Sequence, residues 1–117
     1  MKICYANKKT QKLCEDELKA TRELGKDVAL SLMSLVNLIE SFPNLNDLKA
    51  FPQYRLHALH QDRKHQYSFV INKRYKWRLI VYPMGDDGVI LTDNSNETAM
   101  LTKAVQVEIV EVSEHYD

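Results

Sequence analysis

The spacing of apolar residues changes once along this chain, at Pro52, and this change most restricts the folds open to it. Before Pro52, apolar side chains recur every three or four residues, as they do on the buried side of an α-helix. After Pro52 they alternate with polar side chains, as in strands that bury one face. A chain that keeps its helices and its strands in separate parts belongs to the α+β class.

The helical part follows a short apolar strand in residues 1–6. Asn7 suits the N-cap of a first helix, which Gly25 ends. The apolar positions of this helix recur at helical spacing: Leu13, Cys14, Leu18 and Leu24. A second helix runs from Lys26 to about Ser41. One face of it is apolar: Val28, Leu32, Leu35, Val36 and Ile39. Three further apolar residues widen this face: Leu30, Met33 and Leu38. We therefore expect an N-terminal helical hairpin with one turn at Gly25.

Three alternating segments, residues 54–59, 67–71 and 77–82, predict an antiparallel meander. Within each segment the alternation groups residues on one side: Arg55, His57 and Leu59 in the first, Ser68 and Val70 in the second, and Arg78, Ile80 and Tyr82 in the third. A last strand covers Val105 to Val112. Its apolar set changes parity between Ile109 and Val110, which predicts a β-bulge there or burial on both faces.

Two stretches read as connections. Pro43 and Pro52 break residues 42–53, and glycines with Asp, Asn and Ser mark residues 84–100 as a loop around a possible short strand from Val89 to Thr92. With 117 residues the chain can bury one core and is too short for two. We expect a single domain over residues 1–117, an N-terminal helical hairpin packed on a small, mainly antiparallel twisted sheet.

The absence of certain patterns excludes some classes of protein. No apolar run reaches the length of about 18 residues that a membrane span requires, and "MKICYANKKTQK" turns polar too soon for a signal peptide. A cytoplasmic location is the expectation. Cys4 and Cys14 lack the Cys-x-x-Cys spacing of redox and zinc motifs, and they read as inert thiols.

The charges of the chain are unevenly distributed although the formal net charge is zero. Residues 49–82 carry eight Lys or Arg against one acid, and residues 83–117 carry eight acids against one lysine. A basic face suits a polyanion, and the acidic region could balance it or bind a basic partner. The alternative is that the two segments form neighbouring strands whose charges pair.

Several short motifs, taken in order, resemble the HigB-like toxins of the RelE/ParE superfamily, which belong to bacterial type II toxin–antitoxin pairs. The stretch "RLHALHQDRKHQYSFVINKRYKWRLIVY" and the terminal "VEIVEVSEHYD" carry the resemblance. The matching positions are Arg55, His57 and Leu59; Tyr67, Ser68 and Asn72; Trp77, Arg78, Leu79 and Ile80; and Glu114, His115 and Tyr116. The order of two helices before a sheet is also similar, and the resemblance is weakest across residues 84–102.

The resemblance implies an endoribonuclease that cuts mRNA in the ribosomal A site and thereby inhibits translation. It also implies a cognate HigA-like antitoxin as partner, operator DNA bound only through the antitoxin complex, no membrane partner and no cofactor. In the family the 2′-hydroxyl of the RNA attacks the adjacent phosphate, which requires a base, an acid and cations. The implied catalytic set is Arg55, His57, Arg78, Glu114, His115 and Tyr116. An RNA-binding fringe would be Arg63, Lys64, Lys73, Arg74 and Lys76.

One departure from the family concerns the terminus, where Asp-Tyr-His is replaced by Glu114-His115-Tyr116. Inverting two neighbours on a strand sends each side chain to the opposite face, so the roles do not transfer one to one. A slip at the parity change between Ile109 and Val110 would restore the facing.

Each candidate also has a structural interpretation. Arg55 beside Asp62, or Arg78 beside Glu108, would be an ordinary cross-strand pair, and His57 a half-buried polar residue. His57 and His60 are three apart on a strand and face opposite sides, which disfavours a metal site. Trp77, Tyr67 and Phe69 would be core residues. Two other functions stay open: a ParE-like toxin that binds DNA gyrase without catalysis, and a degenerate member that has lost activity.

Overall fold

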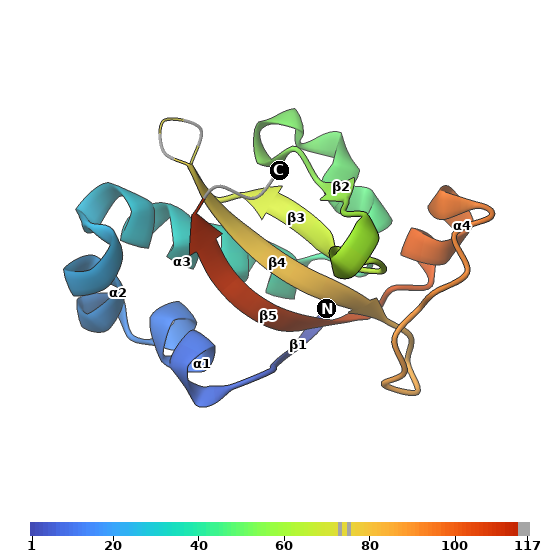
Figure 1. The fold of residues 1–117 in the computed structure, drawn as a ribbon, viewed down its shortest axis with the longest axis horizontal. Helices are drawn as coiled ribbons and strands as arrows, with labels where there is room; N and C mark the ends of the chain where they lie inside the picture. Colours follow the sequence, from blue (N-terminus) through green and yellow to red (C-terminus); the bar gives the residue numbers. More distant parts are fainter. Residues whose placement is uncertain (73, 75, 115–117) are drawn as a thin grey trace.

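The structure is a computed structural model that describes residues 1–72, 74 and 76–114. Within these ranges the chain forms four α-helices and a five-stranded sheet (Figure 1). The α-helices are α1 (Lys8–Glu15), α2 (Glu17–Leu24), α3 (Lys26–Ser41) and α4 (Glu97–Thr102), and the strands are β1 (Lys2–Tyr5), β2 (His57–Ala58), β3 (Tyr67–Val70), β4 (Trp77–Met84) and β5 (Gln106–Glu114). Three 3₁₀-helices complete the set: η1 (Asn46–Ala50), η2 (Pro52–Tyr54) and η3 (Gln61–Arg63). No helix in the described part is long and apolar enough to cross a membrane.

The strands lie in the order β1-β5-β4-β3-β2. β1 runs parallel to β5, and the other three pairings are antiparallel. The meander expected from residues 54–82 is therefore confirmed, with β2 reduced to two residues. The α+β class is confirmed as well, with the three N-terminal helices together and α4 apart from them near the other end of the sheet (Figure 1).

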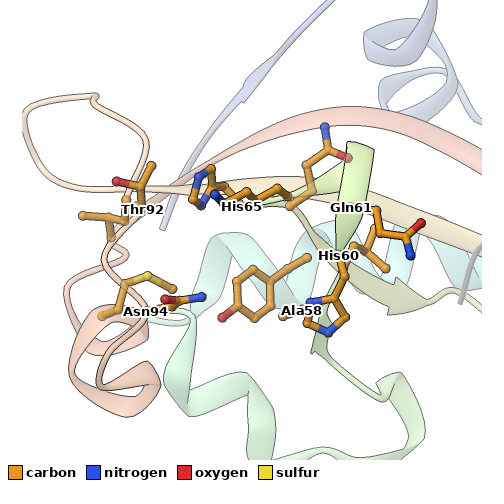
Figure 2. A pocket seen from close by; sticks show the side chains of 12 residues that line it. Ala58, His60, Gln61, His65, Thr92 and Asn94 are labelled. Atoms are coloured by element: carbon orange, nitrogen blue, oxygen red, sulfur yellow. The ribbon is translucent and has the colours of Figure 1, made fainter.

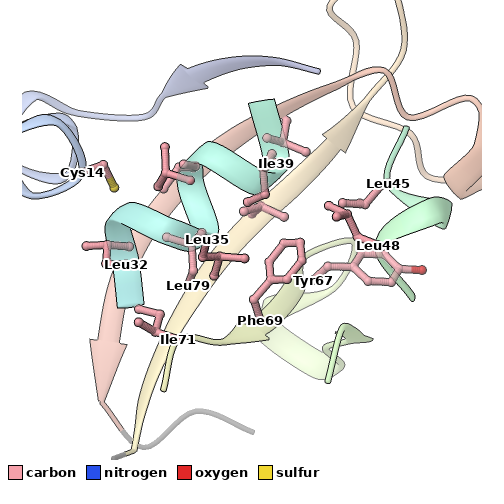
Figure 3. Packing of buried hydrophobic residues seen from close by; sticks show 14 of the residues in the cluster. Cys14, Leu32, Leu35, Ile39, Leu45, Leu48, Tyr67, Phe69, Ile71 and Leu79 are labelled. Carbon is pink, nitrogen blue, oxygen red and sulfur yellow. The ribbon is translucent and has the colours of Figure 1, made fainter. Parts of the chain in front are cut away.

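The hydrophobic core lies between α3 and one face of the sheet (Figure 3). The face of α3 that the sequence predicted is buried, and Leu32, Leu35 and Ile39 are fully so. They meet Phe69 and Leu79, which are the inward residues of β3 and β4. The connection in residues 42–53 belongs to this core, because η1 inserts the buried side chains of Leu45 and Leu48.

The first predicted helix is wrong in one respect, because the chain breaks it at Asp16. Asp16 has extended backbone (φ −113°, ψ 101°), and its carboxylate accepts a hydrogen bond from the Lys19 N–H (3.2 Å), which starts a new helix. An aspartate side chain caps a helix better than it continues one, and this competition explains the break. Leu18, predicted on the apolar face, is 75% exposed as a result. The Asn7 cap is confirmed, since its side chain accepts from the Thr10 N–H.

Residues 84–104 also differ from the expectation. The possible strand from Val89 to Thr92 is reduced to a single bridge between Met84 and Ile90. The helix α4 was not predicted, although its N-cap, Asn96, accepts from the Ala99 N–H in the usual way. At six residues α4 is too short for its apolar period to stand out.

A β-bulge lies at the predicted parity change. Val81 pairs with Ile109 and Ile80 pairs with Glu111, so that Val110 is the extra residue on β5. The buried hydroxyl of Thr10 on α1 donates to the Val110 carbonyl (3.4 Å). The bulge returns Glu111 to the face of the sheet that points away from α3.

A small polar network ties α4 to the core. The Tyr67 hydroxyl donates to Glu97 (2.9 Å), and Lys49 of η1 forms an ion pair with the same carboxylate. The hydrogen bond from Lys49 lowers the pKa of Glu97 most; partial burial acts against it, and the Tyr67 hydroxyl lowers it further. Burial, together with the hydrogen bond, raises the pKa of Tyr67 well above its ordinary range.

The lowered pKa of Glu97 predicts a pH dependence of stability. The stabilisation is present above the ordinary carboxyl pKa of 4.5 and is lost as the pH falls through the lower folded-state value. Because Glu97 is partly exposed to solvent, its ionised carboxylate stabilises the folded state by at most about 1 kcal/mol. Urea unfolding at neutral pH and below the ordinary carboxyl pKa checks this. Glu97→Gln should flatten the acid-side slope, whereas Glu23→Gln on the exposed side of α2 should leave it unchanged.

Candidate functional site

The face of the sheet that points away from α3 brings together two of the residues singled out in the sequence, His57 and Arg78. Residues directly opposite each other on neighbouring strands share a face. The register aligns His57 with Ser68, Ser68 with Ile80 and Ile80 with Glu111. Two residues along each strand, it aligns Val70 with Arg78 and Arg78 with Ser113. We call these seven residues the outer face: His57, Ser68, Val70, Arg78, Ile80, Glu111 and Ser113.

Two predicted site residues, Arg55 and Arg78, line a single pocket at one end of the outer face. The pocket has a volume of about 510 Å³, and Pro52, Gln53 and Val70 complete its lining. Arg55 is exposed and Arg78 half-buried. Guanidinium groups are permanently charged and present planar donors that match phosphate oxygens. This pocket can therefore hold an anionic group between two cations.

The backbone of Arg55 directs the chain from η2 into β2. Its φ of 44° lies in the left-handed region, which is strained for an arginine. Its N–H closes the turn by donating to the Pro52 carbonyl (3.1 Å). Its carbonyl oxygen meets Nδ1 of His57 at 2.7 Å. The strained turn thus holds both the guanidinium position and the imidazole beside it.

The contact with Arg55 determines the tautomer of His57. A carbonyl oxygen only accepts, so Nδ1 of the imidazole must carry the hydrogen. In the neutral ring Nε2 is then the nitrogen with the available lone pair. His57 lies on the outer face, two strand spacings, or about 10 Å, from β4. It can accept or return a proton there.

The β2–β3 loop (residues 59–66) is tied across the outer face by one ion pair. Arg63 in η3 forms it with Glu111 of β5, and the Arg63 guanidinium also donates to the Gln66 side chain (3.1 Å). β5 is separated from β3 by β4, so Arg63 reaches over Ser68 and Ile80, which have no exposed surface. The ion pair divides the outer face into a covered half and the half that opens at Arg55 and Arg78.

The remaining basic candidates lie in two exposed loops. Lys64 follows Arg63 in the β2–β3 loop, and Arg74 and Lys76 are exposed in the β3–β4 hairpin. Asn72 anchors that hairpin, since it donates to Ser31 of α3 (2.7 Å) and accepts from the Arg74 N–H (2.9 Å). Lys73 lies outside the described residues.

The terminal candidates are not brought together with Arg55 and Arg78. Glu114 is paired with Trp77, one position out of step with Arg78 and Ser113, so it belongs to the other face. His115 and Tyr116 lie outside the described residues. The acid that does share the outer face is Glu111, which was missed because alternation read through Val110 without a bulge gives the wrong facing. The parity change was the signal that could have found it.

The structural alternatives are realised in part. Charges of the basic and acidic segments do pair, as Lys49 with Glu97 and Arg63 with Glu111. The specific pairs considered from sequence are different, because Tyr82, not Arg78, lies opposite Glu108. Trp77, Tyr67 and Phe69 belong to the core or pack against it, as the structural interpretation held.

Two observations concern metal-ligating and thiol groups. No group of three or more His, Cys, Asp or Glu able to hold a metal ion occurs among residues 1–72, 74 and 76–114. Burial, with Glu15 nearby, raises the pKa of Cys14 to about 12, and burial also raises that of Cys4. Both thiols therefore stay protonated and are poor nucleophiles.

The fold is similar to that of a solved structure, a YoeB/ParE toxin from Agrobacterium tumefaciens. The match covers 99% of this chain and 100% of that chain, with a TM-score of 0.53 and 13% sequence identity. No protein-family model matches the chain, and comparison with curated proteins also gives no match. At this identity the likeness concerns the fold alone: the chain has the RelE/ParE-like toxin fold that its motifs indicated.

The ion pair across the outer face predicts an energetic coupling between two distant parts of the chain. Both side chains are partly buried, so Arg63→Ala and Glu111→Ala should each destabilise the protein, with a coupling of about 1 kcal/mol in a double-mutant cycle. Urea unfolding of the two single variants and the double variant measures it. The matched control pairs Glu111→Ala with Lys64→Ala, for which the coupling should be close to zero. Strict additivity for Arg63 and Glu111 would contradict the role of the ion pair.

Proposed function

We propose that this chain is the toxin of a type II toxin–antitoxin pair and that it is an endoribonuclease, cleaving mRNA on the ribosome and so inhibiting translation. One observation carries the proposal. Arg55 and Arg78, from separate elements, line one pocket on the outer face, and Arg55 also positions the imidazole of His57. Together they are a phosphate site with a proton-transfer group beside it.

The reaction transfers a phosphoryl group within the RNA, from the 5′-oxygen of one nucleotide to the 2′-oxygen of the nucleotide before it. The ribose 2′-oxygen bonds to the adjacent phosphorus, the bond from phosphorus to the 5′-oxygen breaks, and the products are a 2′,3′-cyclic phosphate and a 5′-hydroxyl. A base removes the proton of the 2′-hydroxyl, and an acid supplies one to the 5′-oxygen. Negative charge grows on the non-bridging oxygens in the transition state, where fixed cations stabilise it.

Residues of the outer face and of the pocket at its end suit these tasks. Arg55 and Arg78 bind the phosphate on which attack occurs and stabilise its developing charge. His57 exchanges protons through Nε2, because Nδ1 is engaged by the Arg55 carbonyl. No bound cofactor or metal ion enters the mechanism, since these side chains supply the charge and the proton transfer.

Glu111 is the acid that the geometry favours for this site. Its carboxylate shares the outer face with Arg78 and is held by Arg63. A phosphate of the RNA would compete with Glu111 for Arg63, and the released carboxylate could then accept the 2′-hydroxyl proton. Glu114 is less suited, because its register pairs it with Trp77. His115 and Tyr116 keep their proposed roles from the sequence resemblance, as acid, base or stacking group.

The proposal includes partners and a place of action. Arg63, Lys64, Lys73, Arg74 and Lys76 would contact RNA phosphates around the site. A HigA-like antitoxin would neutralise the protein, operator DNA would be bound only through that complex, and the cytoplasm would be where the toxin meets ribosomes.

A ParE-like toxin that binds DNA gyrase without catalysis is the second candidate. The solved structure of similar fold is a YoeB/ParE toxin, which favours keeping this candidate. A binding toxin needs a complementary surface but no proton-transfer group, so loss of the His57 imidazole would matter less for it.

The test is induced expression in a bacterium that lacks the antitoxin, with new 5′ ends mapped on mRNA minutes after induction. The unmodified chain should produce cuts inside translated frames. Arg78→Ala and Arg55→Gly should reduce cutting by about a hundredfold or more, as expected for loss of a charge-stabilising donor. Glycine at position 55 keeps the left-handed backbone and removes only the guanidinium. Arg22→Ala, on exposed helix α2, is the matched control and should cut normally.

Two results would count against the nuclease. Growth arrest without cuts, together with a change in plasmid supercoiling, would establish the gyrase-binding alternative. No arrest at all, with the protein folded and abundant, would mean that this chain is not an active toxin.

A further inference from the structure

A second pocket lies at the opposite end of β2 from Arg55, between the β2–β3 loop and the loop that precedes α4 (Figure 2). Its volume is about 270 Å³, just below the range usual for drug-sized ligands. It therefore has room for one flat ring system and not for a peptide. Two histidines, His60 and His65, line it.

The floor of this pocket is apolar and fixed in place. Leu59, Leu91 and Met100 contribute aliphatic surface, and Tyr67, which is 2% exposed, adds a small aromatic part. Tyr67 is held by its hydrogen bond to Glu97, which Lys49 also holds. A rigid apolar floor favours a ligand with a flat, poorly solvated face.

The rim is polar, and its side chains make no hydrogen bonds within the described residues. They come from both loops: His60, Gln61, His65, Thr92 and Asn94. Imidazole, amide and hydroxyl groups offer donors and acceptors without a fixed charge. The lining contains no carboxylate, and Lys64 is its one permanently charged residue. These groups suit the edge of a neutral heterocycle better than a metal ion or a polyphosphate.

Backbone strain is concentrated at the same pocket. Gln61 and His65 have φ values of 59° and 73°, and apart from Arg55 they are the non-glycine residues with positive φ in the described part of the chain. Such conformations are uncommon for glutamine and persist only where surrounding contacts enforce them, often at ligand sites. Here Arg63 braces the loop from the side of the outer face, which leaves His60, Gln61 and His65 turned to the pocket.

We infer that this pocket binds one unpaired nucleobase of the RNA substrate. An apolar aromatic floor with amide and imidazole groups around it is how proteins recognise splayed single-stranded bases. Lys64 stands beside the pocket to meet a neighbouring phosphate, and β2 connects it with the Arg55 and Arg78 pocket. Ala58 and Tyr67 of this pocket face the α3 side of the sheet, whereas Val70 and Arg78 of the other pocket face the opposite side. An RNA strand that passes around the sheet edge at β2 would place its reacting phosphate in one pocket and this base in the other. The assignment to RNA rests on the proposed function.

The experiment is a titration followed by the imidazole carbon-bound proton signals of His60 and His65. The probes are adenosine, guanosine, cytidine and uridine, with ribose 5-phosphate as the probe that has a sugar and a phosphate but no base. At least one nucleoside should shift both histidines, and ribose 5-phosphate should not. Asn94→Ala should weaken the binding of that nucleoside by about tenfold. The exposed Asn37→Ala on α3 is the matched control and should bind as the unmodified chain does.

Equal shifts with ribose 5-phosphate would make the pocket an anion site and overturn the inference, and so would the absence of shifts with every nucleoside. The outcome is separable from that of the proposed function, because nucleosides carry no phosphate for Arg55 and Arg78. If RNA is cut and no nucleoside binds at His60 and His65, the inference alone fails. If nucleosides bind there and no RNA is cut, the base pocket stands and its assignment to a cleaved RNA fails.

Discussion

Burial of α3 against one face of the sheet is the constraint on which the rest of the molecule depends. Leu32, Leu35 and Ile39 pack there on Phe69 and Leu79, and all are fully buried. Each such side chain contributes about 1.5–3 kcal/mol relative to leaving it in water. Because this packing occupies one face of β3 and β4, every second residue of these strands is directed to the other face. For that reason His57, Ser68 and Arg78 share the outer face.

The β2–β3 loop covers part of the outer face, which removes an apolar side chain from water but leaves a buried hydroxyl without a partner. Ile80 has no exposed surface, and the hydroxyl of Ser68 is buried without a hydrogen-bond partner within the described residues. The loop covers both by reaching from Arg63 to Glu111 over two strands. A partly buried ion pair stabilises little by itself, since desolvation offsets much of its attraction. Its effect here is geometric: it leaves the other half of the face exposed at Arg55 and Arg78.

The residues with strained backbone conformations lie on either side of the short strand β2. Arg55 lies before β2 and Gln61 and His65 after it, all with left-handed backbone. Such residues are stable only where neighbouring structure holds them. The rigid parts that do so are the η2 turn on one side and the Arg63 contacts on the other. The two-residue edge strand β2 therefore holds the two candidate binding pockets at a fixed distance from each other.

The sequence by itself determined what local periodicity and local capping can determine. Alternation was enough to put Arg55 and His57 on one side of their segment and Arg78 opposite the apolar side of its own, because side chains on a strand have a strict period of two. Pairing between the strands then placed His57 and Arg78 on one face. The parity change at Ile109 and Val110 was enough to mark the position and left two alternatives, a bulge or burial on both faces, of which the structure has the bulge. Tertiary structure decided the rest. The acid on the outer face is Glu111, because the facing of residues after a bulge depends on pairing with β4. The helix breaks at Asp16 because capping and continuation compete locally and packing selects between them. The nucleobase pocket joins residues near 60 with residues near 92, and no local pattern can bring together two loops that only the fold makes neighbours.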